Sequence, residues 1–362
     1  MATATDTKTT DHYEAWKTES ERSIQRLRNL ADIVAGSREP AVGQSARQEV
    51  YRKGKARLFY YEGKPTYQTP ILFVPNLGIS RPYIFDLLPK GSFVEYMVQH
   101  GFAFYLLDWG VFGPEDDYLT LTDCVTRILP RMAKKLLAHA DARDCSVVGY
   151  CMGAPLAASF LATHQEFPVR NFVNLAGPID FSDMGLIGCW LNRRYFDVDK
   201  LVGTMGQMPA EMVQMGFKLL RPTMDMSTAL NLWWNLWDEG YVEGFRALNK
   251  WANEYVPFPG EFFRQWVKEF YQDNRLPQGT LRLAGRRVDL GSISCPVLAI
   301  GAAQDNIAPP RSVKAMIDLV ASRDKEYLEV PGGHISLIAG RSASRDCWPH
   351  VAGWLASRSS RA

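Results

Sequence analysis

The stretch VVGYCMGAPLAA, residues 147–158, places Cys151 between two glycines where a short apolar run gives way to a helical pattern. A G-x-nucleophile-x-G turn from a strand into a helix is strained, and its two backbones crowd one another, so both flanking positions need glycine. Gly149 and Gly153 meet that need. The start of the following helix favours a negatively charged sulfur. The pattern predicts a nucleophile at Cys151, although a core cysteine in a chance match is the alternative at this point.

Short apolar runs recur on both sides of this turn, with helical patterns between them. The order strand, helix, strand is typical of a doubly wound, mostly parallel sheet, and strongly apolar runs suit strands that are covered on both faces. Residues 120–139 form one helical pattern, in which Pro130 predicts a kink. The predicted strands are ARLFYYE (56–62), ILFVP (71–75), FAFYLLDW (102–109), CSVVGY (145–150), NFVNLAG (171–177), PVLAIGA (296–302) and EYLEVP (326–331).

The alternation is interrupted once. Residues 178–290 are helical in pattern, Met-rich and then Trp-rich, and a strand follows soon after them. We therefore expect an α/β core in two parts, residues 46–177 and 291–362, with an inserted helical cap or lid at 178–290. Residues 1–45 predict an exposed amphipathic helix of mixed charge and a linker.

Two more residues occur at the positions where such a fold presents catalytic groups. Asp305 follows the strand at 296–302, and His334 follows the last strand within the loop VPGGHISL. Nucleophile, acid and histidine in this chain order are typical of the α/β-hydrolase fold. Taken singly, Asp305 reads as a turn or helix-cap residue and His334 as an ordinary loop histidine. Together with Cys151 they predict a Cys-His-Asp triad.

The same fold predicts where a tetrahedral oxyanion would be bound. The backbone N–H after the nucleophile belongs to Met152, and a second N–H is expected from the loop Pro75-Asn76-Leu77, for which we take Asn76.

Composition excludes several other classes of protein. The 362 residues carry a formal net charge of +2 without a basic cluster, which argues against a nucleic-acid partner. The N-terminal sequence lacks the apolar run of a signal peptide, and no stretch is apolar enough for a membrane span, so we expect a cytoplasmic protein. Six cysteines without CxxC spacing fit neither a zinc site nor a disulfide scaffold, and we expect no metal and no cofactor.

The sequence resembles the catalytic subunit of polyhydroxyalkanoate synthases in their short, two-subunit form. The resemblance covers most of residues 50–356. One departure is Ala154, where these synthases usually have a second glycine, and we expect altered packing there but intact chemistry. The resemblance is carried by RPYIFDLLP (81–89), FYLLDWG (104–110), GYCMG (149–153), GPIDFSD (177–183), FYQDNRL (270–276), GRRVDL (285–290), AAQDNIAPP (302–310) and PGGHISL (331–337).

That resemblance implies an acyltransferase that polymerises 3-hydroxyacyl coenzyme A, most simply 3-hydroxybutyryl coenzyme A, and releases coenzyme A. It implies Cys151 as the acylated nucleophile, His334 as its base, and Asp305 as the residue that orients the histidine or helps to activate the substrate hydroxyl. It also implies a growing polyester chain, a granule surface, an accessory synthase subunit and a homodimer as partners. The N-terminal helix is better suited to contact a partner subunit than a granule.

The predicted cap contains two further groups of interest. Its aromatic residues either line a dry channel for the polymer or are ordinary packing and dimer-contact residues. Its early basic residues, Arg193, Arg194, Lys218 and Arg221, could meet coenzyme A phosphates, but a solvated basic face is the simpler interpretation. The aromatic residues are Trp233, Trp234, Trp237, Trp251, Tyr255, Phe262, Phe263 and Trp266.

Two other functions are compatible with parts of this pattern. A dienelactone-hydrolase-like cysteine hydrolase or thioesterase would also use a GYC elbow with Asp and His, although such enzymes are smaller and lack a long cap. A non-catalytic granule or scaffold protein would not need to keep all three triad residues.

Overall fold

A computed structural model of the chain describes residues 5–220, 224–340 and 342–361. Its centre is an eight-stranded sheet in which β1 and β2 are antiparallel to their neighbours and the other strands run parallel. This is the expected α/β-hydrolase architecture. The strand order is β1 (Arg47–Lys53), β2 (Ala56–Tyr61), β5 (Phe104–Asp108), β3 (Ile71–Val74), β6 (Cys145–Tyr150), β7 (Val169–Leu175), β11 (Val297–Ala302) and β12 (Lys325–Val330).

All seven predicted strands are confirmed, and the sheet contains one strand that the pattern did not show. β1 has the sequence RQEVYRK and lies at the edge of the sheet, where its side chains are exposed or half-buried. An edge strand of charged residues lacks the apolar run by which a buried strand is recognised. The expected sheet is therefore extended by one antiparallel strand, which forms a hairpin with β2.

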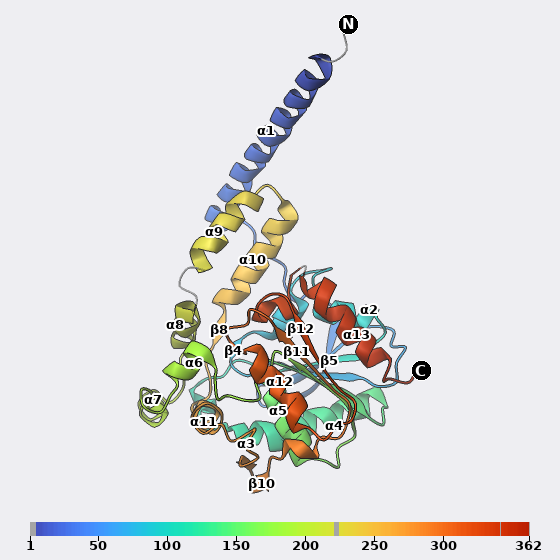
Figure 1. Ribbon diagram of the computed structural model, residues 1–362, viewed down its shortest axis with the longest axis vertical. Coiled ribbons are helices and arrows are strands. Elements are labelled where there is room, and N and C mark those ends of the chain that lie inside the picture. Colours follow the sequence, from blue (N-terminus) through green and yellow to red (C-terminus); the bar gives the residue numbers. More distant parts are fainter. Residues whose placement is uncertain (1–4, 221–223, 341, 362) are drawn as a thin grey trace.

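Both faces of the sheet are covered by helices (Figure 1). Leu72 and Val74 of β3 lie in one apolar cluster with α4 (Leu129–Ala140), α5 (Gly153–Thr163) and α12 (Pro310–Leu319). Ile71 and Phe73 of the same strand lie in a second cluster with α2 (Phe93–Gln99) and α13 (Trp348–Ala356). Alternate residues of a strand point to opposite faces, so a strand covered on both sides must be apolar throughout.

The predicted helix at 120–139 is present, and Pro130 disturbs it in an identifiable way. The helix begins as α3 (Leu121–Asp123), widens into a π-helical turn, η3 (Cys124–Ile128), and continues as α4. Pro130 stands in the first turn of α4, where its missing N–H is least costly. The helix is thus irregular just before Pro130, where the sequence predicted a kink.

Helices occupy most of the segment between β7 and β11. The cap consists of α6 (Gly185–Trp190), α7 (Val198–Met205), α8 (Ala210–Leu220), α9 (Met224–Asn235), α10 (Glu239–Asn253), α11 (Gly260–Trp266) and the π-helical η4 (Val267–Gln272). Two short strand pairs lie outside the main sheet: β4 (Ile79–Ser80) with β8 (Tyr255–Val256), and β9 (Arg282–Leu283) with β10 (Arg286–Arg287). The short helical turns are the 3-10 turns η1 (Pro82–Asp86), η2 (Pro114–Asp116), η5 (Leu290–Ser292) and η6 (His334–Leu337), and the π turn η7 (Ala343–Cys347).

The N-terminal helix α1 (Thr5–Ala35) projects away from this body, and only its C-terminal part lies beside α9 and α10 (Figure 1). The expected exposed helix is confirmed. None of the described helices combines the length and the apolar character that a membrane crossing requires.

Replacing Gly153 by alanine is expected to destabilise the protein, because a Cβ there would overlap the carbonyl oxygens of Val74 and Pro75. Forcing the two backbones apart should lower the free energy of unfolding by about 1–3 kcal/mol. Gly216→Ala in α8 is the control, since a Cβ at that position meets open space, and it should raise the stability by roughly 0.5–1 kcal/mol. Urea unfolding of both variants measures the difference. Equal stabilities would contradict the close approach.

Candidate active site

The nucleophile elbow is a strained turn at the carboxyl end of β6. Cys151 has a φ of 53°, which is the left-handed region that residues with a Cβ avoid. Its N–H donates to the carbonyl of Leu175 (3.0 Å), and its carbonyl accepts from the N–H of Ala154 (3.0 Å). The thiol is half-buried, so it stands at the sheet edge and is not sealed in the core. A strained, accessible cysteine at this turn has the geometry that nucleophilic chemistry requires.

The structure shows how the alanine at position 154 is accommodated. Ala154 is fully buried, and its methyl group lies against the backbone of Gly177. A Cβ at Gly177 would overlap that methyl, so the alanine at position 154 fits because residue 177 is a glycine. Alanine in place of the second glycine therefore changes the packing beside the elbow.

Asp305 and His334 meet in a buried hydrogen bond. His334 Nδ1 lies 2.7 Å from Asp305 Oδ2, and the side chains are exposed by 7% and 0%. Asp305 Oδ1 accepts from the N–H groups of Ile307 (2.8 Å) and Ala308 (2.9 Å), which hold the carboxylate in place. With Nδ1–H donating to Asp305, the free lone pair of a neutral imidazole lies on Nε2. The pair is arranged so that Nε2 can act as a base.

His334 Nε2 is buried and has no hydrogen-bond partner of ordinary geometry among the described residues. Burial lowers the pKa of His334, but the charge of Asp305 and the interactions with Asp305 and Cys151 outweigh that effect and hold the pKa of His334 above its ordinary value. The Cys151 thiol is therefore in electrostatic contact with the imidazole. An unpartnered buried nitrogen beside an accessible thiol is suited to receive a proton from sulfur.

Tyr150 supports the imidazole from the side of the sheet. Its ring centre lies 5.1 Å from that of His334, and its hydroxyl donates to the backbone carbonyl of His334 (3.3 Å). Burial raises the pKa of Tyr150 well above its usual range, and the nearby Cys151 and Asp305 act in the same direction. Tyr150 therefore stays neutral and keeps its hydroxyl proton for the carbonyl.

Two backbone loops are joined so that the acid and the base stay in register. The N–H of Gln304 donates to the carbonyl of Gly332 (2.9 Å), and the side chain of Gln304 accepts from the N–H of Gly332 (2.6 Å). Because one loop carries Asp305 and the other carries His334, this reciprocal pair fixes their separation. Sequence reasoning missed Gln304, whose only signal was its place beside Asp305.

The two predicted oxyanion donors lie on adjoining backbones. Gly153 packs against the carbonyls of Val74 and Pro75, which brings the elbow and its Met152 against the loop that carries Asn76. Within the described part of the chain, neither backbone N–H has a protein acceptor. The Asn76 side chain is engaged elsewhere, since its Nδ2 donates to the carbonyl of Gly78 (2.8 Å). The backbone N–H is thus the group that Asn76 can offer.

Tyr271 is a second residue that sequence reasoning did not single out. It lies in the π-helical turn η4, is in electrostatic contact with Cys151, and packs edge-on against Phe181 with ring centres 5.0 Å apart. Asn274 holds this region by accepting from the N–H of Phe181 (2.9 Å) and donating to Asp180 (2.8 Å). Both residues lie within the FYQDNRL motif, which was the available signal. Wide π turns recur at functional sites.

The predicted aromatic cap residues do not form one lining. Trp233 and Trp234 are exposed on α9, and Trp237 lies under the guanidinium of Arg22 from α1. Trp251 donates to the carbonyl of Arg81 (2.9 Å). Of the eight, Trp266 makes ring contact with Tyr271 beside Cys151. The sequence left a channel and ordinary packing both open; most of these side chains lie in different surroundings, but Phe262 and Trp266 stack with ring centres 6.3 Å apart.

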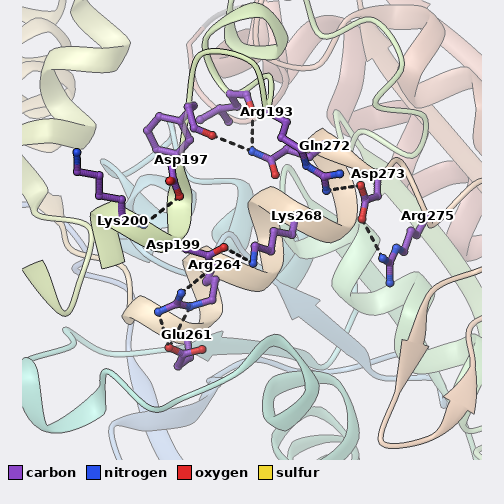
Figure 2. Close-up of polar contacts among 12 residues, drawn as sticks. Arg193, Asp197, Asp199, Lys200, Glu261, Arg264, Lys268, Gln272, Asp273 and Arg275 are labelled. Atoms are coloured by element: carbon purple, nitrogen blue, oxygen red, sulfur yellow. Dashed lines mark hydrogen bonds and ion pairs between the residues drawn. The ribbon is translucent and has the colours of Figure 1, made fainter. Parts of the chain in front are cut away.

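The early basic residues of the cap, for which a solvated basic face was the simpler interpretation, do not gather around one hollow. Arg193 lines a hollow of about 540 Å³ beside α7 and η4, but its guanidinium pairs with Asp273 (2.6 Å). Figure 2 shows the surrounding charges interleaved, with Asp199 held by Arg264 and Lys268 (both 2.5 Å). Arg194 and Lys218 do not line this hollow, and Arg221 lies outside the described residues. Paired charges of both signs make a poor site for a phosphate group.

Across residues 5–220, 224–340 and 342–361, no three His, Cys, Asp or Glu side chains gather in a way that could hold a metal ion.

Comparisons with known proteins agree with this geometry. Residues 70–340 match the model of the α/β-hydrolase fold family. A poly(3-hydroxyalkanoate) polymerase subunit PhaC from Haloferax mediterranei is 34% identical over 340 residues, covering 93% of this chain and 69% of the relative. The PhaC subunit of Allochromatium vinosum is 34% identical over 321 residues, covering 87% of this chain and 90% of the relative.

Similar solved structures share the fold at low sequence identity. A lipase from Sulfolobus solfataricus has a TM-score of 0.57 at 13% identity, covering 88% of this chain and 97% of its own. Monoglyceride lipase from Saccharomyces cerevisiae has a TM-score of 0.56 at 13% identity, with the same coverage. These similarities establish the architecture.

Asp305→Asn is expected to lower the pKa of His334, because the change removes a negative charge while burial continues to disfavour the imidazolium. Nitrogen NMR of the histidine side chains across a pH series measures the shift. Glu326→Gln is the control: Glu326 bonds His350 at 2.8 Å on another part of the fold, so the His334 titration should not move. An unchanged His334 titration in Asp305→Asn would show that the carboxylate charge does not act on the imidazole.

Proposed function

This chain belongs to the poly(3-hydroxyalkanoate) polymerase PhaC family, and we propose that it polymerises 3-hydroxyacyl coenzyme A, most simply 3-hydroxybutyryl coenzyme A, with release of coenzyme A. Membership makes the chain an acyltransferase built on the α/β-hydrolase fold. The observation that carries the proposed chemistry is the buried, unpartnered Nε2 of His334 in electrostatic contact with a half-buried Cys151.

In the first step the Cys151 thiol passes its proton to His334 Nε2, and the sulfur attacks the thioester carbonyl of the substrate. A free cysteine thiol is mostly protonated at neutral pH, so a neighbouring base increases the fraction that can attack. The oxyanion of the tetrahedral intermediate accepts hydrogen bonds from the N–H groups of Met152 and Asn76. The bond to the coenzyme A sulfur then breaks, and coenzyme A leaves with the proton from His334.

In the second step a hydroxyl group attacks the acyl-cysteine. It comes from a bound chain end or a second substrate, and His334 removes its proton as the new ester bond forms. The Cys151 sulfur is the leaving group and recovers the proton from His334. Asp305 acts as a positioning residue, because it fixes the ring and stabilises the imidazolium in both steps.

A cysteine nucleophile suits this sequence of reactions. Exchanging the coenzyme A thioester for a cysteine thioester is close to isoenergetic, so the acyl group keeps its reactivity until an alcohol arrives. A serine nucleophile would form an oxygen ester of lower energy. The free energy of the thioester is then released in the step that makes the polymer ester.

Water competes with the alcohol for the acyl-cysteine, and aromatic packing beside Cys151 opposes it. The rings of Phe181, Trp266 and Tyr271 pack together, and Tyr271 is in electrostatic contact with Cys151. Apolar rings leave few hydrogen-bonding groups to hold a water molecule in position. We include this cluster in the proposal as the part of the cap that favours polymer over hydrolysis.

The family resemblance also implies three partners, which we include in the proposed function. They are an accessory synthase subunit, a second copy of the chain and the surface of a polyester granule in the cytoplasm.

Incubation with 3-hydroxybutyryl coenzyme A should leave an acyl group on the peptide 147–158, and mass spectrometry of the digested protein detects it. Cys151→Ala should abolish the adduct and lower the rate of thiol release by about 10³-fold or more. Cys189→Ala is the matched control, because Cys189 is an exposed cysteine in α6 and should not be needed. Labelling at another residue would overturn the assignment of Cys151.

Tyr271→Ala is expected to divert acyl groups from polymer to soluble acid, because water gains access to the acyl-cysteine. The ratio of insoluble polymer to free 3-hydroxybutyrate, measured against total thiol release, reports the partition. Trp234→Ala is the control, since Trp234 is an exposed aromatic residue on α9. Thiol release that yields only soluble acid in the unaltered protein would instead identify a hydrolase.

A further inference from the structure

The loop that carries Asn76 is fixed at its start by the core of the fold. It leaves β3 at Pro75, whose carbonyl accepts from the indole Nε1–H of the buried Trp109 (3.1 Å). The elbow lies against the same carbonyl at Gly153. The Asn76 side chain donates to the carbonyl of Gly78 (2.8 Å) and braces the loop from within. The core therefore holds the first end of this loop.

The far end of the loop is a strained turn. The N–H of Ser80 donates to the carbonyl of Gly78 (2.7 Å), which makes a three-residue γ-turn with Ile79 at its centre. Ile79 has a φ of 64°, and a γ-turn with positive φ at its centre is the rare and strained form. A β-branched residue keeps such a conformation only where its surroundings impose it. The turn at Ile79 therefore needs support from another part of the fold.

The cap supplies contacts at this turn. The strand β8 pairs antiparallel with β4, and Ile79 lies opposite Val256 in that pair. The ring of Phe258 lies against Gly78, at the place that a Cβ would occupy. Phe258 is held within the cap by two backbone hydrogen bonds with Met208 (3.0 and 3.2 Å). In Figure 1 the helix α10 runs down to β8, which lies beside β4 where the cap meets the core.

Two side-chain hydrogen bonds continue this attachment just beyond the turn. The indole of Trp251 donates to the carbonyl of Arg81 (2.9 Å), and the hydroxyl of Tyr83 donates to Glu254 Oε2 (2.9 Å). Glu254 is itself paired with Lys250 of α10 (3.0 Å). We call the bonds made by Trp251 and Tyr83 the latch. The core thus holds the loop before Asn76, and the cap holds the chain after it.

We propose that β8 and the latch keep the strained turn at Ile79 in place and thereby position the backbone N–H of Asn76 for the oxyanion. The inference rests on the proposed function, since it gives residues of the cap a part in that reaction. Ile79, Tyr83 and Trp251 are positioning residues that act through the loop. A donor aids the transition state only when it is held within about 0.5 Å of the productive geometry.

Tyr83→Phe with Trp251→Phe removes both hydrogen bonds of the latch and keeps the rings. Single-turnover acylation of Cys151 by 3-hydroxybutyryl coenzyme A should slow by on the order of 10-fold, which is less than the roughly 10²–10³-fold cost of losing a whole oxyanion donor. Tyr195→Phe with Trp190→Phe is the matched control, because it makes the same changes at exposed positions of the cap and should not slow acylation.

Hydrogen exchange read by mass spectrometry tests the loop without reference to activity. In the latch variant, the amides of residues 76–83 should exchange about 5-fold faster or more, and those of residues 147–158 should not change. Adding Ile79→Gly to the latch variant should restore acylation to within about 3-fold of the unaltered rate, because glycine adopts a positive φ without support. A general loss of packing would not be repaired by removing a half-buried side chain.

The outcomes separate this inference from the proposed function. Slower acylation with faster loop exchange, and recovery in the glycine variant, supports the positioning role. Unchanged acylation or unchanged exchange in the latch variant contradicts it, and so does slow acylation that Ile79→Gly does not recover. Each of these results leaves the proposed function intact when Cys151 is acylated in the unaltered protein. The lack of that acyl group in the unaltered protein would overturn the proposed function and the positioning role together. Thermal unfolding shows that each variant is folded.

Discussion

The close approach of two backbones at Gly153 is the constraint on which the site depends. A parallel sheet brings the carboxyl ends of β3 and β6 to one edge, and the absence of a Cβ lets the elbow rest on the carbonyls of Val74 and Pro75. That contact turns Cys151 out at a positive φ and sets Met152 against the loop of Asn76. The same close contact thus positions both the proposed nucleophile and the proposed oxyanion donors.

The charged part of the site is held by a different set of contacts. Asp305 is buried without exposed surface, which would be costly for an unpaired carboxylate, but two N–H groups and the His334 imidazole satisfy it. The pair of Gln304 and Gly332 joins the two loops that carry these residues. The imidazole is therefore fixed in direction. Its Nε2 has no hydrogen-bond partner of ordinary geometry among the described residues, so it is not used for a structural hydrogen bond.

Different parts of the inserted helical segment contact the site and the N-terminal helix α1. One part of the cap packs the rings of Trp266 and Phe181 against Tyr271, which is in electrostatic contact with Cys151. Another part, α9 and α10, holds the base of α1 through polar contacts and leaves an apolar helix face outward. The same inserted segment thus contacts both the residues around Cys151 and the base of α1.

The sequence by itself determined the fold class, the seven apolar strands and the chain order of Cys151, Asp305 and His334, because apolar periodicity and glycine-flanked turns are local features of a chain. It missed the edge strand β1, whose charged residues carry no burial signal, and composition alone left a channel and ordinary packing both open for the aromatic residues of the cap. Only the tertiary structure decided that Tyr271 lies by the thiol, that Gln304 joins two loops and that α1 turns its apolar side outward. Those outcomes depend on which faces distant segments present to one another, and residue spacing within a segment does not encode that.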